Sequence, residues 1–293
     1  MIGLAEPNMK NPKIYPVLLF LSIFPALCCG EGIAYEWLPH GSRYPTPIFD
    51  PKAAVHSVSM LNYDVAGADD HVAYVPVTLS LRQQFIRITQ SDQRFLELGM
   101  NFCVYSQWSI VDVGEAFMGG VQNTDYRISG VGTYSWNPET FMRVSIFHQS
   151  SHLGDDYIIR NEITKATLRT LNYEQLDLSF TKKYQNWQAY LGAGYNVSPN
   201  TVRGRSTFQI GSEYTRPSTH VQGMALKLGS NLTIHEQNDF SPNLRMGLGV
   251  EVGRNTSTPF IVMFSAFKGH LPYSTLEYQK VQLLGLSLII PVH

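Results

Sequence analysis

The chain has 293 residues, a formal net charge of −1 and a charged fraction of only 15%. Because nucleic-acid binding needs clustered basic residues, this balance predicts no nucleic-acid partner. The charged fraction is well below the roughly 25% of a typical soluble domain, which favours a chain that is not surrounded by water on all sides.

The first thirty residues have the pattern of an export signal. Lys10 and Lys13 precede an uncharged apolar segment, residues 14–30, that ends in small residues. We therefore expect a signal peptide over 1–30, cleaved near residues 28–32, with lipid modification of Cys28 or Cys29 as the alternative. Cys103 is then the only certain cysteine of the mature chain, so no internal disulfide is expected.

Residues 31–52, EGIAYEWLPHGSRYPTPIFDPK, contain four prolines and no clean hydrophobic period. We interpret this segment as an extended periplasmic leader or a plug.

From residue 53 to residue 293 the dominant pattern is alternation with period two, which indicates β-strands. In NLRMGLGVEVG (243–253), every second residue from Leu244 to Val252 is apolar, and the residues between them are charged or glycine. We predict twelve strands, with the count uncertain by about two because the pattern of one barrel strand is weak. They lie at residues 53–63, 75–88, 94–107, 125–136, 141–152, 171–183, 187–197, 207–216, 222–232, 242–253, 258–268 and 278–291.

The lengths of the connections distinguish a membrane barrel from a soluble β-sandwich, which would also alternate. The connections after even-numbered strands are short, whereas those after odd-numbered strands are mostly longer, especially 108–124 and 153–170. Short periplasmic turns and long outer loops are typical of bacterial outer-membrane barrels. We therefore predict an all-β, antiparallel transmembrane barrel in the outer membrane of a Gram-negative bacterium, with the barrel assembly machinery as a partner.

One strand carries polar residues where the lipid face should be apolar. In FMRVSIFHQSSHLGDDY (141–157), His148, Ser150 and His152 share a face with Met142 and Ile146. Polar groups on a lipid face are costly and need a local reason. A histidine two residues from a serine can act as the general base for that nucleophile, which predicts chemistry on an outer-leaflet lipid.

This His-x-Ser pair resembles the catalytic pair of outer-membrane phospholipase A and the lipid A 3-O-deacylases, which lies on the outer face of a barrel. The resemblance implies a serine-type lipid hydrolase with a third residue, Asn or Glu, on the barrel wall. If residues 153–169 form the loop, His148 opposes Glu174 and Ser150 opposes Asn172. If LGDDY is a hairpin tip, His148 opposes Glu162. We prefer Glu174, and expect oxyanion donors in the backbone near residues 153–154.

A longer resemblance covers most of the mature chain. The segments LPHGSRYPTPIFDP, DYRISGVGTYSW, RVSIFHQSSHLGDDYIIRN and LNYEQLDLSF are similar to a bacterial family of uncharacterised outer-membrane barrel proteins, a domain-of-unknown-function family. This resemblance implies the fold and the location, and no activity.

Two non-enzymatic interpretations remain open. His148, Ser150 and His152 also fit a polar cluster that binds outer-membrane lipid or lipopolysaccharide headgroups. Alternatively, the barrel is a narrow channel or a structural protein, with these charged residues lining the lumen: Arg82, Arg143, Asp177, Lys227, Arg245 and Glu251.

Metal binding has weaker support from the sequence. His148 and His152 lie about 13 Å apart on an extended strand, too far to share a metal. Asp155 and Asp156 are candidates for Ca²⁺, although paired acids in a turn are usually just solvated. No other cofactor is expected.

Overall fold

The computed structural model describes residues 32–65, 71–90, 94–112, 117–164, 171–198, 203–272 and 274–292. The expected export signal and its cysteines lie outside these residues. Within them, no helix is both long and apolar enough to cross a membrane.

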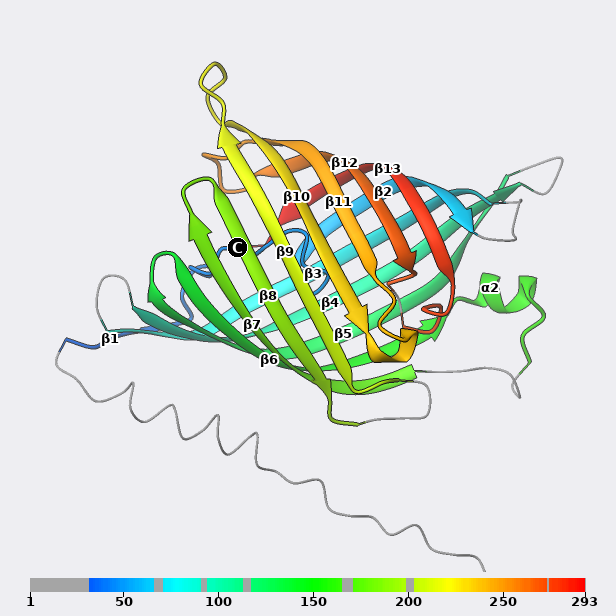
Figure 1. The fold of residues 1–293 in the computed structure, drawn as a ribbon, viewed down its shortest axis with the longest axis horizontal. Helices are drawn as coiled ribbons and strands as arrows, with labels where there is room; N and C mark the ends of the chain where they lie inside the picture. The colour runs from blue at the N-terminus through cyan, green and yellow to red at the C-terminus, as the bar shows by residue number, and fades with distance from the viewer. Residues whose placement is uncertain are drawn as a thin grey trace, which may run out of the picture.

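Twelve antiparallel strands form a closed barrel, as predicted (Figure 1). Each strand pairs with its neighbour in sequence, and β13 pairs with β2 to close the sheet. The barrel strands are β2 (Val55–Val65), β3 (His71–Thr89), β4 (Phe95–Asp112), β5 (Phe117–Asn137), β6 (Thr140–Leu153), β7 (Leu171–Tyr184), β8 (Trp187–Asn196), β9 (Ser206–Pro217), β10 (Met224–His235), β11 (Asn243–Val252), β12 (Phe260–His270) and β13 (Lys280–Pro291).

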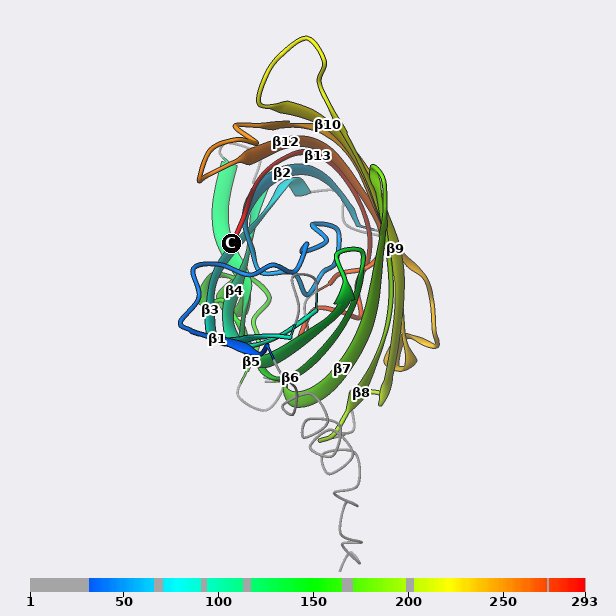
Figure 2. The same cartoon turned by 90° about the vertical axis from the view of Figure 1, so that its left-hand side faces the viewer.

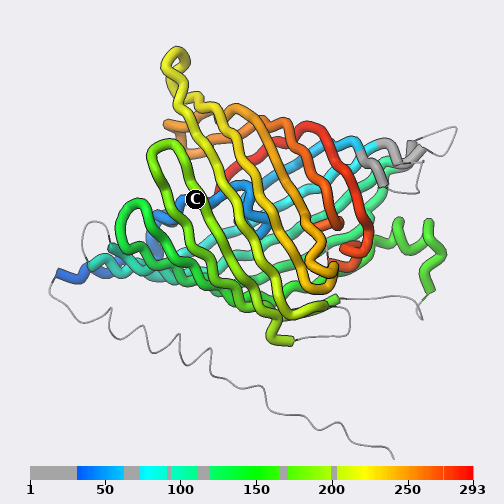
Figure 3. Tube along the Cα trace, viewed as in Figure 1, coloured from blue at the N-terminus to red at the C-terminus, as the bar shows by residue number. Residues whose placement is uncertain are grey.

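The two ends of the barrel differ. We call the end with the connections after β3, β5, β7, β9 and β11 the turn end, and the opposite one the loop end (Figure 3). A short strand, β1 (Ala34–Trp37), pairs with the last residues of β3 at the turn end. The 3-10 helix η2 (Glu236–Asn238) follows β10 at the loop end.

Alternation sorts the side chains as the sequence predicts. On β11, Leu244, Met246 and Leu248 point out of the barrel and are 40%, 48% and 51% exposed. Asn243 and Glu251 point inward and are buried. Apolar residues outside and polar residues inside are the pattern of a barrel surrounded by lipid.

Two of the predicted loops are wrong in part. Most of 108–124 is strand, because β4 and β5 continue as a paired hairpin as far as Asp112 and Phe117. A bulge hid these strands from the alternation: the register shifts between Gln107 and Trp108, and the neighbouring residues Gln122 and Asn123 are both buried.

Part of 153–170 is helical. Helix α2 (Asp155–Arg160) starts after Gly154, with two acidic residues in its first turn and Arg160 in its last. This charge order matches the helix dipole. The side chain of Asp156 accepts a hydrogen bond from the backbone N–H of Val121 and fixes α2 to the β4–β5 hairpin.

Residues 39–54 run inside the barrel, and we call them the plug (Figure 2). Tyr44 packs against Phe95 and Phe141 near the turn end, and its hydroxyl is 2.9 Å from that of Thr181. Deeper inside, Phe49 packs among inward-facing apolar residues of β12 and β13. The plug therefore fills the turn half of the lumen before the chain enters β2.

Candidate active site

The residues of interest lie on β6, three to five residues before the strand ends at the loop end. His148 points outward and Ser150 lies on the same face, whereas Gln149 is buried and Arg143 lies over the ring of Tyr44 in the lumen. The predicted facing is confirmed. His148 and Ser150 are therefore on the membrane face of the barrel.

The β6–β7 register opposes His148 to Glu174 and Ser150 to Asn172. His148 Nδ1 is 2.7 Å from Glu174 Oε1, and the two side chains are 45% and 40% exposed. The alternative pairing with Glu162 does not form, because Glu162 lies in the turn after α2. Alternation allows both partners, because Glu162 and Glu174 are separated by an even number of residues, and helix α2 in the β6–β7 connection leaves Glu174 as the one on β7.

The serine has a different partner from the one expected. Ser150 Oγ is 2.7 Å from His152 Nε2, and His152 packs edge-on against the ring of Tyr126, with ring centroids 6.1 Å apart. His152 lies two residues from Ser150 on the same face, as does His148. This spacing is the signal from which a second serine partner could have been anticipated.

The four side chains thus form two hydrogen-bonded pairs, His148–Glu174 and Ser150–His152. Glu174 occupies Nδ1 of His148, so Nε2 is the ring nitrogen that remains for a proton acceptor role. Ser150 Oγ contacts His152 and not His148, so the two pairs are separate in this structure. The backbone N–H of Gly154 donates to Gln122 O, so it is not a free oxyanion donor.

The site lies on an open surface and not in a cavity. Exposed apolar side chains flank it on β5, β6 and β8, including Ile128, Ile146 and Tyr195. His148, Ser150 and Glu174 line none of the three cavities found among the described residues. A ligand would reach them sideways, through the membrane.

The residues near the site do not form a metal-binding set. No group of three or more His, Cys, Asp or Glu side chains in the described part of the chain is placed to hold a metal ion. Asp155 and Asp156 lie in the first turn of α2, and Asp156 is bonded to Val121.

The charges that were considered as channel lining are mostly paired. Lys227 faces Glu251 at 3.8 Å, Asp177 binds Lys52 of the plug at 2.7 Å, and Arg82 donates to Thr46. Asp177, Lys227 and Glu251 thus form ion pairs inside the barrel, and the plug occupies the turn half of the lumen.

Residues 25–290 match the model of a family described as "Protein of unknown function (DUF1207)". No curated protein matches the chain. The fold resembles an active-site mutant of outer membrane phospholipase A from Escherichia coli, with 13% identity and a TM-score of 0.55, covering 86% of this chain and 94% of that one. It also resembles the dimer of Salmonella typhi outer membrane phospholipase with bound calcium, with 13% identity and a TM-score of 0.53, covering 82% of this chain and 93% of that one. At these identities the likeness shows the fold, a barrel of the bacterial outer membrane.

Proposed function

Because the chain belongs to the DUF1207 family, whose description assigns no function, we propose from its own geometry that it hydrolyses an ester bond of an outer-leaflet lipid. Ser150 is the nucleophile, His148 the general base and Glu174 the residue that orients His148. The observation that carries this proposal is the 2.7 Å contact of His148 with Glu174, on the membrane face and two residues from Ser150.

The chemistry follows from the two nitrogen positions. Nδ1–H of His148 donates to Glu174, which leaves Nε2 to accept the Ser150 proton as Oγ bonds to the ester carbonyl carbon. The carboxylate stabilises the imidazolium that forms. Collapse of the tetrahedral intermediate breaks the ester C–O bond, and the leaving alcohol takes the proton from Nε2. Water, deprotonated by the same nitrogen, then releases the fatty acid from Ser150.

The position of the site supports a lipid as the substrate. A histidine–carboxylate pair is expensive in contact with acyl chains, so its presence there needs a purpose. The flanking apolar side chains offer a surface on which an acyl chain can lie. If the loop end is extracellular, as in bacterial barrels with long outer loops, the site lies at the outer leaflet. The two similar phospholipases make a lipid substrate reasonable by analogy only.

The test is release of fatty acid from phosphatidylethanolamine vesicles that contain the purified barrel. Ser150→Ala should lower the rate at least about a thousandfold, because no other group supplies the nucleophile. Ser106→Ala is the matched control: Ser106 also points outward, and it contacts Thr124 instead of a histidine. It should keep the wild-type rate.

Substitutions of Glu174, the residue that orients His148, provide a second test, in which the activity should fall by different amounts. Glu174→Gln keeps an oxygen that can accept from Nδ1–H and should lose much less activity than Glu174→Leu, which removes the acceptor. Equal fatty-acid release by wild type and Ser150→Ala would reject the hydrolase. The contacts of His152 with Ser150 and Tyr126 would then favour a polar cluster that anchors lipid headgroups.

A further inference from the structure

Two adjoining cavities of about 130 and 70 Å³ lie inside the barrel, and together we call them the lumen chamber. Both are bounded by Pro51 at the tip of the plug, on one side, and by Pro272 of the β12–β13 connection, on the other. Arg127, Arg245, Gln149 and Phe267 line both cavities. The chamber is thus held between two inserted segments, one from each end of the barrel.

The smaller cavity is rich in cations. Its lining includes Lys52, Arg127, Arg203 and Arg245, against the single carboxylate of Glu277. Lys52 is neutralised by Asp177 of the barrel wall, and Arg203 is paired with Glu277. Among the Lys and Arg residues that line the smaller cavity, Arg127 and Arg245 are therefore the two without an ion pair to a carboxylate.

Arg127 is held in place by neutral groups. Its guanidinium lies 5.1 Å from the ring centroid of Tyr105 and 4.6 Å from that of Phe147, and two of its nitrogens donate to the carbonyl oxygen of Gln149. The third nitrogen, Nη1, is buried without a hydrogen-bond partner in the described structure. The nearby carboxylate of Asp125 is occupied by Asn123, Gln149 and Ser274.

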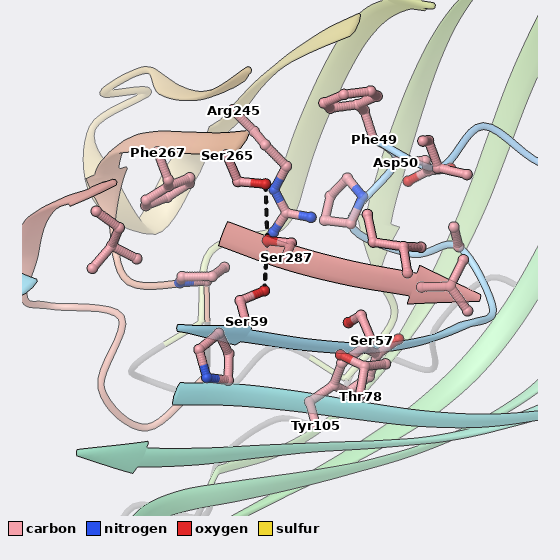
Figure 4. A pocket seen from close by; sticks show the side chains of 18 of the residues that line it. Phe49, Asp50, Ser57, Ser59, Thr78, Tyr105, Arg245, Ser265, Phe267 and Ser287 are labelled. Carbon is pink, nitrogen blue, oxygen red and sulfur yellow. Dashed lines mark hydrogen bonds between the residues drawn. The ribbon is translucent and has the colours of Figure 1, made fainter. Parts of the chain in front are cut away.

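Arg245 faces the chamber from β11. Its guanidinium points toward Ser287, which is hydrogen-bonded to Ser59 and Ser265 at 2.7 and 2.8 Å (Figure 4). No ion pair or side-chain hydrogen bond of Arg245 occurs within the part of the chain that the structure describes. A buried or half-buried charge of this kind needs a counter-ion, because desolvation is costly.

We propose that the lumen chamber binds a phosphate-type oxyanion between Arg245 and Arg127. Guanidinium groups bind phosphate oxygens through charge-assisted hydrogen bonds. The two guanidinium groups reach the chamber from different strands, Arg127 from β5 and Arg245 from β11, so they can bind different oxygens of one tetrahedral anion. The space is sufficient for a small oxyanion together with waters. This site is independent of the membrane-facing residues.

The experiment uses the whole barrel with its plug, refolded in detergent without phosphate and equilibrated with each inorganic phosphate concentration until the signal is constant, so that the inserted segments do not limit entry. Calorimetry in chloride buffer at constant ionic strength should show saturable phosphate binding. Phosphate should also raise the midpoint of heat unfolding, because it binds only the folded state. Arg245→Gln should weaken binding at least about tenfold, since one charged partner is lost.

Lys227→Gln is the matched control. Lys227 is also an inward-facing cation, but it is paired with Glu251 and lines none of the three cavities. It should bind phosphate like the wild type. Heat-modified mobility on a gel checks that each variant is folded. Equal binding by wild type and Arg245→Gln, or no saturable binding by the wild type, would overturn the proposal.

Discussion

His148 and His152 are the same residue type on one strand face, each two positions from Ser150, yet they have different partners. Glu174 lies opposite His148 on β7 and takes its Nδ1, whereas His152 has the ring of Tyr126 beside it and contacts Ser150 Oγ. In the proposed mechanism His148 is the base because a carboxylate orients it. His152 then holds the serine in a resting position.

The two histidines should therefore respond differently to substitution. His148→Ala should reduce fatty-acid release about as much as Ser150→Ala, because the general base and the nucleophile act as a unit. His152→Ala should leave the rate unchanged or raise it, since Ser150 is then free to turn to His148. Initial rates of fatty-acid release from phosphatidylethanolamine vesicles measure both effects. A loss confined to His152→Ala would assign the base to His152.

At the scale of the elements, Glu236 joins two strands at the loop end. Its carboxylate accepts from the backbone N–H of Ser206 at 2.8 Å and of Arg205 at 3.0 Å, and so ties η2 to the beginning of β9. These bonds hold the pKa of Glu236 below its ordinary value of 4.5, and the bond from the Ser206 backbone N–H has the largest effect. The connection is therefore sensitive to acid.

Because the folded-state pKa is lowered, the stabilisation is present above pH 4.5 and is lost as the pH falls through the folded-state pKa. Over this acid range we expect the backbone amides of Arg205 and Ser206 to lose protection against hydrogen exchange. The measured exchange rates are first corrected for the intrinsic effect of pH. Glu236→Gln should show weaker protection already at neutral pH and no further change on acidification. Hydrogen exchange by mass spectrometry measures both. Identical profiles for the two proteins would contradict this role.

At the scale of the whole molecule, the barrel is closed in two senses. The β2–β13 pairing removes the sheet edge, and the plug fills the turn half of the lumen. The plug is accommodated by Gly229 and Gly247, where an added Cβ would overlap Phe49. The main chain of Phe49 is also bound by Glu213 at 2.9 Å. We therefore expect no steady ion current through the wild type.

Gly229→Ala should displace Phe49 and loosen the plug, because overpacking of this kind costs about 1–3 kcal/mol. Its heat-unfolding midpoint should fall, and current steps should appear in planar bilayers. Gly130→Ala is the matched control, since a Cβ there meets only Ile146 at 3.8 Å. Steady conductance in the wild type would show that the plug does not seal the lumen.

The sequence by itself determined the features that depend on alternation. Period two separates the lipid face from the lumen, so it predicted the strands, their number and the outward facing of His148 and Ser150. Alternation also excluded every register of β7 that differs by one residue, because such a slip would expose the wrong face to lipid, but it left both Glu174 and Glu162 as partners of His148. The long-range resemblance to the barrel family agreed with the family match.

Only the tertiary structure decided the features that depend on closure. Where a bulge interrupts the alternation, as in the β4–β5 hairpin, pairing across the sheet sets the strand length and the hydrophobic pattern does not show it. The path of the plug and the shared cavities of Arg127 and Arg245 bring together residues of distant segments, and no local pattern encodes this. Closing the sheet brings them together, because a barrel turns the inner faces of distant strands toward one shared space.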